Sequence, residues 1–148
     1  MNYTYKSPQT KQEWQAYFDL RWRILRAPWQ QARGSERDDL EASAYHVMAQ
    51  DSGNNIIGTG RLHRVSERCA QIRYMAVAPD FRGRGIGSGL LAMLEQQARE
   101  WLCREIILNA RTESLAFYAH HNYSVIGDAP LLFGVITHKR MRKLLQAK

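Results

Sequence analysis

Apolar residues recur along the chain at two different spacings, and the change from one to the other predicts a mixed α/β protein. From Trp14 to Leu25 they return every three or four residues, which is the period of one face of a helix. Thr10 and Glu13 precede this segment as a capping box. The helix is expected to end near Ala27-Pro28, because the residue before a proline avoids helical backbone angles.

Shorter apolar runs bounded by turn residues predict the strands, which are expected at residues 2–6, 45–50, 55–65, 72–78 and 105–110. Turn sequences at residues 51–55 and 66–68 join three of them, so these should form an antiparallel meander. The segment at 105–110 contains the apolar run Ile-Ile-Leu, which is typical of a strand buried on both faces beside a parallel neighbour.

A second helix should connect the strands at 72–78 and 105–110, with Leu90, Leu94 and Ala98 on its apolar face. Glu95 and Arg99, four residues apart, are expected to support it from the exposed side. A strand, a helix and a parallel strand form a right-handed unit, and strands that diverge at their ends open a slot. We therefore predict one mixed α/β (α+β) domain over residues 1–148, with a mostly antiparallel central sheet, one splayed parallel strand pair and flanking helices.

A glycine-rich loop stands between the central strand and the second helix, with glycines at positions 83, 85, 87 and 89 and arginines at 82 and 84. Backbone amides at a helix start converge on one point, where the helix dipole also favours an anion, so the loop predicts a phosphate site. It is not a nucleotide-hydrolase loop, because no lysine follows Gly87. Nor is it a dinucleotide fingerprint, because Ser88 stands where the third glycine belongs.

The sequence Arg82-x-x-Gly85-x-Gly87, after a strand that contains Met75 to Val77, resembles the acyl-CoA motif of the Gcn5-related N-acetyltransferase (GNAT) family. The resemblance implies the acyl-CoA N-acyltransferase fold, with loop amides on the pyrophosphate and the strand edge on the pantetheine arm. The residues it assigns to acetyl-CoA are Met75, Val77, Arg82, Gly83, Arg84, Gly85, Ile86, Gly87, Ser88, Asn109 and Ser114. Asn109 and Ser114 could equally be a strand end and a helix cap.

A second part of the resemblance lies in the pair Phe117-Tyr118, followed by Asn122-Tyr123 where the family has Gly-Phe. It implies that Tyr118 is the general acid that protonates the departing thiolate, which is reasonable for a phenol held near sulfur. The alternative is a core aromatic residue with its hydroxyl satisfied.

The general base is left open by the sequence. Some relatives use a glutamate on the central strand, and Gln71 stands at its place here and cannot accept a proton at neutral pH. A water relay or an imidazole could replace it. His138 is the strongest histidine candidate, because Gly134 to His138, with Met141, resembles a C-terminal segment of one bacterial acetyltransferase subgroup.

The resemblance implies acetyl transfer from acetyl-CoA to a primary amine of a small molecule or peptide, by direct attack in a ternary complex. The polar segment at residues 29–41 should border the acceptor. Its carboxylates could meet a cationic substrate or simply be solvated; they are Glu36, Asp38, Asp39 and Glu41.

Composition limits the alternatives. The 45% hydrophobic share argues against disorder. The net charge of +7 keeps a basic nucleic-acid-binding module, or a non-catalytic acyl-CoA binder, as the rival class. No recognition helix, metal-ligand spacing, membrane-length apolar run or signal peptide is visible, so we expect no nucleic acid, no metal, no membrane and a cytoplasmic location. The oligomeric state stays open, with a homodimer as one option.

Overall fold

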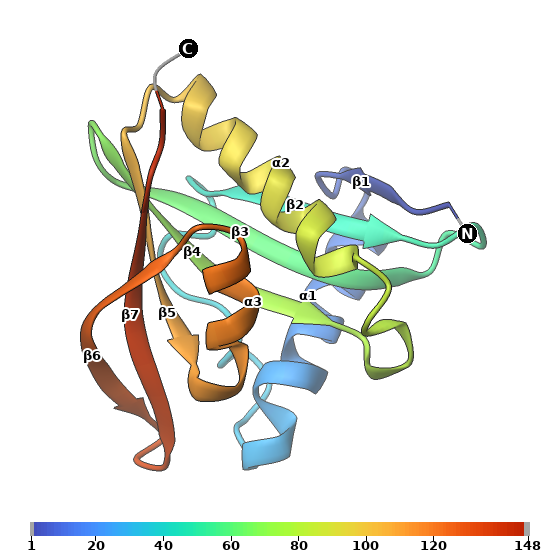
Figure 1. The fold of residues 1–148 in the computed structure, drawn as a ribbon. Coiled ribbons are helices and arrows are strands. Elements are labelled where there is room, and N and C mark those ends of the chain that lie inside the picture. Colours follow the sequence, from blue (N-terminus) through green and yellow to red (C-terminus); the bar gives the residue numbers. More distant parts are fainter. Residues whose placement is uncertain (1, 147–148) are drawn as a thin grey trace.

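The computed structural model describes residues 2–146, which form one seven-stranded sheet with helices on both faces (Figure 1). The strand order is β1-β2-β3-β4-β5-β7-β6, and every neighbouring pair is antiparallel except β4 with β5. The strands are β1 (Thr4–Lys6), β2 (Tyr45–Gln50), β3 (Ile56–Ser66), β4 (Cys69–Val77), β5 (Glu105–Arg111), β6 (Ser124–Leu132) and β7 (Ile136–Leu144).

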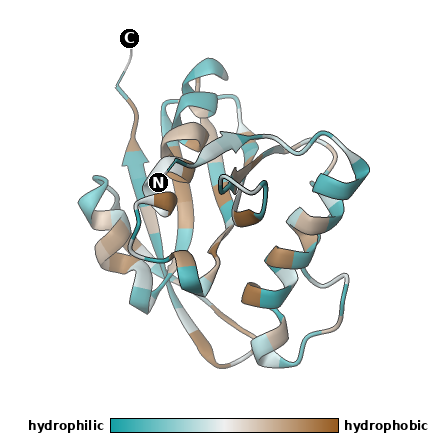
Figure 2. Cartoon of the chain, turned by 90° about the vertical axis from the view of Figure 1, so that its right-hand side faces the viewer, coloured by the Kyte–Doolittle hydropathy of each residue, from teal (hydrophilic) through white to brown (hydrophobic). Residues whose placement is uncertain are grey.

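Three α-helices cover the sheet: α1 (Lys11–Leu25), α2 (Ile86–Glu100) and α3 (Leu115–His120). Short 3₁₀ turns precede or follow them: η1 (Ala27–Trp29), η2 (Pro79–Phe81) and η3 (Thr112–Ser114). In the view of Figure 2, helices lie on both sides of the sheet, and hydrophobic and hydrophilic positions alternate along them. Among the described residues, no helix has the length and apolar character that a membrane crossing requires.

Alternate residues of β2 show how the two faces are filled. Val47 and Ala49 belong to the large core cluster that contains Leu90 and Leu94 of α2. Met48, between them, packs instead with Tyr17 of α1 in a smaller cluster. Since successive strand side chains point to opposite faces, α1 and α2 lie on opposite sides of the sheet.

The helix starts and the turns follow from local sequence. Thr10 Oγ1 accepts a hydrogen bond from the Glu13 amide at 3.0 Å, and the Glu13 carboxylate accepts one from the Thr10 amide at 3.2 Å. The predicted capping box is therefore confirmed. Asn122, with a φ of 72°, ends the last helix in the left-handed region, which asparagine tolerates better than most residues.

Two features differ from the prediction. Glu95 is buried rather than exposed, and its carboxylate accepts hydrogen bonds from the Tyr123 hydroxyl and from Lys143 Nζ, both at 2.9 Å. The prediction was wrong because helical spacing to Arg99 reveals nothing about the partners that β7 supplies. Strands β6 and β7 were not among the predicted strands, since most of their residues are exposed or only partly buried and the two segments lack the alternation of a half-buried strand.

The feature of the sheet that creates the site is the parting of β4 from β5. The two strands pair only from Cys69 to Ile72 on β4, opposite Glu105 to Leu108 on β5. On the other side of β4, the register with β3 shifts at Tyr74, whose φ of 60° is unusual for an aromatic residue. Such an irregularity bends a strand, and β4 continues beyond it alongside β3 alone.

Candidate active site

The predicted phosphate site lies at the start of α2. Gly83 and Gly85 have φ values of 75° and 81°, and a Cβ built on either residue meets no atom within 4 Å. Glycine is therefore needed here for the backbone conformation, and the space around it is open. The first helical hydrogen bond runs from the Gly89 amide to the Gly85 carbonyl at 3.0 Å, so the amides of Ile86 to Ser88 precede the helical ladder.

The other two glycines of the motif have a packing role. A Cβ on Gly89 would lie 2.2 Å from the Tyr5 ring, and one on Gly87 would lie 3.2 Å from the Phe117 ring. Gly83 and Gly85 thus form the open loop, whereas Gly87 and Gly89 let α3 and β1 approach α2 closely. The sequence alone gave no sign of this division.

The start of α2 suits an anion. No side chain of the described chain caps α2, and its first turn contains no acidic residue. Arg82 and Arg84 are exposed on the loop. Ile86 is buried in the core, so only its backbone can face a ligand. The Ser88 hydroxyl lies 2.9 Å from His121 Nε2 and is engaged there. The group of Ser88 that can bind a phosphate is therefore its backbone amide.

The slot beside β4 is lined by backbone groups. The Ala78 amide donates to the Ile57 carbonyl on β3 at 2.8 Å. Because peptide groups alternate in direction along a strand, those of Ala76 also face β3, and those of Met75 and Val77 face the opposite side. The pairing with β5 has ended at Ile72, so the Met75 and Val77 groups face the open slot. They are positioned as the pantetheine contacts predicted from the resemblance.

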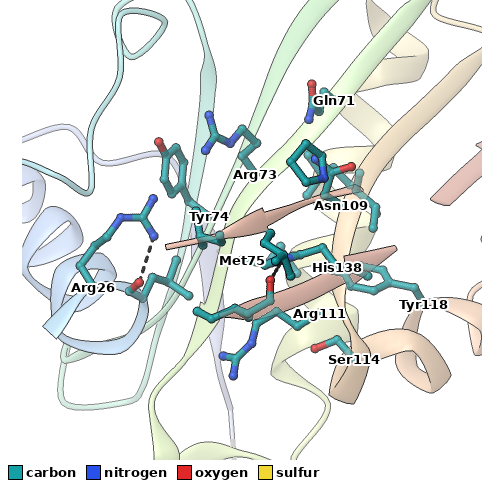
Figure 3. Close-up of a pocket in the computed structure, with 18 of the residues that line it drawn as sticks. Arg26, Gln71, Arg73, Tyr74, Met75, Asn109, Arg111, Ser114, Tyr118 and His138 are labelled. Carbon is teal, nitrogen blue, oxygen red and sulfur yellow. Dashed lines mark hydrogen bonds between the residues drawn. The ribbon is translucent and has the colours of Figure 1, made fainter. Parts of the chain in front are cut away.

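A cavity of about 410 Å³ opens where β4 and β5 part (Figure 3). It gathers side chains from β4, β5, η3, α3 and β7, with the end of α1 closing one side. Of the predicted residues, Met75, Asn109, Ser114 and Tyr118 line it. Val77 and the loop residues Arg82 to Ser88 lie outside the lining, on the path from the cavity to the start of α2.

Tyr118 is the predicted general acid. It lies on α3, is 7% exposed and lines the cavity. Within residues 2–146 its hydroxyl has no hydrogen-bond partner. Burial raises the pKa of Tyr118 above its ordinary value of 10, because a phenolate would lose its hydration. The phenol is therefore protonated at neutral pH and able to donate a hydrogen bond into the cavity.

His138 and Gln71 both line the cavity, from β7 and β4 respectively. His138 Nδ1 lies 3.1 Å from the Ile136 carbonyl oxygen, which can only accept a hydrogen bond. In the neutral imidazole the proton therefore resides on Nδ1, and Nε2 carries the free lone pair. Gln71 offers an amide and no proton-accepting carboxylate.

Two carboxylates of the acidic segment form internal ion pairs. Asp38 accepts from both Nη atoms of Arg61 at 2.6 and 2.9 Å, and Arg73 Nη1 lies 3.1 Å from it. Glu41 pairs with Arg21 at 2.9 Å and with Arg61 at 3.0 Å. The sequence left open whether these carboxylates meet a cationic substrate or are simply solvated. Asp38 and Glu41 do neither, because buried arginines of α1 and β3 bind them.

Glu36 and Asp39 are the other two carboxylates of the acidic segment. Glu36 is buried and its carboxylate accepts a hydrogen bond from the Gly34 amide at 2.8 Å, while Asp39 is exposed. Neither lines the cavity, nor does any other carboxylate of the described chain.

Three arginines line the cavity that the sequence did not single out: Arg26, Arg73 and Arg111. In a basic chain such residues resemble ordinary solvated side chains, and no spacing links the end of a helix to two separate strands. Their shared location becomes visible only when α1, β4 and β5 are placed side by side. No group of three or more metal-ligating side chains occurs within residues 2–146.

Comparison with known proteins agrees with the geometry. The pattern of the acetyltransferase (GNAT) family matches residues 14–123. An uncharacterized N-acetyltransferase of Bacillus subtilis, YjcF, is 31% identical over 108 residues, covering 73% of this chain and 76% of its own. An acyl-CoA N-acyltransferase from Pseudomonas aeruginosa superposes with a TM-score of 0.79 at 25% identity, covering 96% of this chain and 98% of its own.

The fold is also that of a GNAT acetyltransferase from Elizabethkingia anophelis solved with acetyl-CoA bound, with a TM-score of 0.79 at 18% identity over 97% of this chain and 99% of its own. The predicted acyl-CoA N-acyltransferase fold is thus confirmed. The loop at the start of α2 fits the anionic coenzyme of such proteins, since it offers open space, amides and arginines. The chain therefore belongs to the acetyltransferase (GNAT) family and is an acetyl-CoA-dependent N-acetyltransferase.

Proposed function

We propose that the protein transfers an acetyl group from acetyl-CoA to a primary amine of a small molecule or peptide, by direct attack within a ternary complex. The observation that supports this most is the single cavity between the parted strands, which Met75, Tyr118 and His138 all line. Acetyl-CoA supplies the acyl group as a thioester. The chain supplies position, polarisation and two proton-transfer groups.

The coenzyme site that we propose runs from the loop to the cavity. Amides of Gly83 to Ser88, with Arg82 and Arg84 nearby, would hold the pyrophosphate. Backbone groups of Met75 and Val77 would hold the pantetheine arm along the open edge of β4, with Asn109 and Ser114 beside its end. Holding two reactants in one reactive geometry can by itself accelerate the reaction by several powers of ten.

The chemistry divides between two walls of the cavity. The amine nitrogen attacks the thioester carbonyl carbon, forming a C–N bond as the C–S bond breaks. The Met75 amide, facing the slot, would stabilise the negative charge that develops on the carbonyl oxygen. His138 Nε2 would take the proton that the amine loses, directly or through a water. Tyr118 would donate its phenolic proton to the departing sulfur.

The names of relatives do not decide the acceptor. One relative, from Mycobacterium tuberculosis, is called an amino-acid acetyltransferase and is 34% identical over 82 residues. A structural neighbour with a TM-score of 0.78 at 15% identity is an aminoglycoside 6'-N-acetyltransferase complexed with coenzyme A. Their acceptors differ in charge, so the acceptor of this chain has to be inferred from its own residues.

A thiol-release assay tests the proposal. The protein is incubated with acetyl-CoA and a broad panel of amines, and the acetylated products are identified by mass spectrometry. Amine-dependent release supports the transferase. Tight coenzyme binding without release above background for any amine would favour the non-catalytic binder. Retention on immobilised DNA that falls steeply with salt would favour the nucleic-acid-binding module.

Location and assembly are further parts of the proposal. Cys69 and Cys103 are both buried free thiols, which is in keeping with the reducing cytoplasm. A homodimer would cover apolar side chains such as Val125 and Ile126 on the edge strand β6, which are 51% and 46% exposed. Sedimentation analysis distinguishes this dimer from a monomer.

A further inference from the structure

The part of the cavity away from α3 is positively charged. Its lining includes Arg26 at the end of α1, Arg73 on β4 and Arg111 at the end of β5, beside His138. Within the described chain, the lining contains no aspartate and no glutamate. The three arginines enter from different elements and border the same space (Figure 3). An acceptor in this space therefore meets cationic groups.

Arg26 has no carboxylate partner. The residue is only 6% exposed, and its guanidinium donates from Nε to the Ser35 carbonyl at 3.0 Å and from Nη1 to the Leu25 carbonyl at 2.9 Å. No ion pair joins it to a carboxylate of residues 2–146. A buried charge without a counter-charge is costly, and an anionic ligand group would compensate it.

The surroundings of Arg26 contain more cations than anions. Four guanidinium carbons lie 4.1 to 5.6 Å from the centroid of the Tyr74 ring; they belong to Arg21, Arg26, Arg61 and Arg73. Only two carboxylates, Asp38 and Glu41, form ion pairs with this group in the described structure, and both contact the fully buried Arg61. Four cations therefore share two carboxylates, and Arg26 is the member of the group that forms no ion pair with them.

Arg73 and Arg111 remain accessible to a ligand. The Arg73 side chain is 39% exposed and contacts Asp38 through Nη1. The Arg111 guanidinium lies 4.9 Å from the Trp29 ring, and its Nε is buried without a hydrogen bond. The carboxylate nearest to Arg111 Nε, at 3.4 Å, is that of Glu113, whose side chain is 70% exposed.

We propose that the acceptor is an amine that also carries a carboxylate, such as a free amino acid, and that Arg26, Arg73 and Arg111 bind this carboxylate. The proposal rests on the proposed acetyl transfer and specifies its substrate class. Guanidinium groups match the planar carboxylate with paired hydrogen bonds. The cavity of about 410 Å³ suits a small acceptor beside the end of the pantetheine arm rather than a large polycation.

An acceptor bound in this way has a defined orientation in the cavity. Arg111 and His138 are directly opposed on β5 and β7, so their side chains share one face of the sheet. A carboxylate held by the arginines would therefore place an adjacent amine near the His138 imidazole. Arg111, which would bind the carboxylate, and His138, which would accept the proton of the amine, are then neighbours on one wall of the cavity.

Matched acceptors test the substrate class directly. Leucine, leucinamide and isoamylamine share a side chain and differ in charge at the carboxyl position. We expect kcat/KM to fall roughly 10- to 100-fold when the carboxylate is removed, as is typical for loss of a charged hydrogen bond. Phosphoethanolamine and spermidine extend the series to a phosphate and a polycation. The same amines are titrated calorimetrically into the complex with coenzyme A, which measures binding without turnover.

Arginine variants test the assignment of residues. Arg73→Gln and Arg111→Gln should raise KM for the carboxylate-bearing amine about 10-fold or more, with little change for the neutral amine. Arg23→Gln is the matched control, since Arg23 lies on α1, pairs with Asp19 at 2.8 Å and does not line the cavity. Arg26 is buried, so Arg26→Lys is used only if circular dichroism shows a folded protein.

The outcomes separate this inference from the proposed function. Preference for the carboxylate that is lost in Arg73→Gln and Arg111→Gln, but kept in Arg23→Gln, supports the inference. Acetylation of spermidine or isoamylamine at least as efficient as that of leucine and the other amino acids overturns the carboxylate class while the transferase stands. Better use of phosphoethanolamine overturns the carboxylate in favour of a phosphate. Failure of every amine overturns the proposed function, and the inference with it.

Discussion

The guanidinium carbon of Arg21 lies 4.1 Å from the centroid of the Tyr74 ring, directly at the irregularity that parts β4 from β5. Tyr74 keeps a φ of 60°, a conformation that costs a non-glycine residue about 1–3 kcal/mol. The ring is 8% exposed, and its packing against the buried arginines offsets this strain. The slot at Met75 and Val77 thus depends on a tyrosine that does not itself belong to the predicted coenzyme contacts.

This relationship predicts an inverted order of stability between two variants. Tyr74→Ala and Tyr74→Gly both lose the ring, but only glycine accepts the positive φ without strain. We expect the glycine variant to be more stable than the alanine variant by about 1 kcal/mol, opposite to the usual order of these residues in strands. Urea unfolding of both proteins measures the difference. An alanine variant that equals or exceeds the glycine variant would contradict the strained conformation.

Gly85→Glu should abolish acetyl-CoA binding. The glycine at position 85 has a φ of 81° and borders open space at the start of α2, so a glutamate would both strain the loop and place a negative charge at the phosphate site. Isothermal titration measures the affinity. Gly127→Glu adds the same charge at another exposed glycine with open space around it and should bind normally. Unchanged affinity in a folded Gly85→Glu protein would refute the site.

Tyr118→Phe should lower kcat by roughly 10²- to 10⁴-fold, the range for loss of a general acid, while the coenzyme affinity changes little. Burial raises the pKa of this phenol, so it donates rather than accepts at neutral pH. The control is Tyr123→Phe, which removes the hydrogen bond to Glu95 outside the cavity and should lower Tm but not kcat. A full turnover number in Tyr118→Phe would remove this tyrosine from the mechanism.

His138→Gln tests the base. The Nδ1 bond to the Ile136 carbonyl leaves Nε2 as the basic nitrogen, so its removal should lower kcat/KM by roughly 10²- to 10⁴-fold, the range for loss of a general base. His120→Gln changes an exposed histidine at the end of α3 and should leave kcat/KM unaltered. If His138→Gln keeps its full kcat/KM, a water relay without this imidazole accounts for the reaction better.

Asp38 should make the free energy of unfolding depend on pH in the acid range. Burial alone would raise its pKa, but hydrogen bonds from Arg61 and the Leu40 amide outweigh burial and hold it at about 2, below the ordinary 3.8. The folded state therefore binds fewer protons than the unfolded state between these values, so the stabilisation is present above pH 3.8 and is lost as the pH falls toward about 2. The free energy of unfolding of Asp38→Asn should fall less over this pH interval than that of the unchanged protein. Asp39→Asn is the control and should show the same fall as the unchanged protein.

Local sequence determined most of the elements, because their signals act over a few residues. The capping box at Thr10 and Glu13, and the left-handed Asn122, depend on atoms that are neighbours in the chain. The loop at Gly83 and Gly85 is of the same kind. These features were predictable, since no distant partner is needed to explain them.

The features that were missed depend on distant partners. Glu95 is buried because Lys143 and Tyr123 reach it from β7 and from the end of α3, and nothing in the helical pattern announces them. For the carboxylates of residues 29–41 the sequence left substrate contact and solvation open. Asp38 and Glu41 are bound instead by Arg61 and Arg21, which are fully buried, a rare position for a charged residue.

A crystal structure with acetyl-CoA bound tests the account most directly. We predict the pyrophosphate on the amides between Gly83 and Ser88, the pantetheine along Met75 and Val77, and the sulfur within hydrogen-bond reach of the Tyr118 hydroxyl. A coenzyme bound away from the start of α2, or a sulfur remote from Tyr118 with the acetyl group outside the cavity, would contradict it.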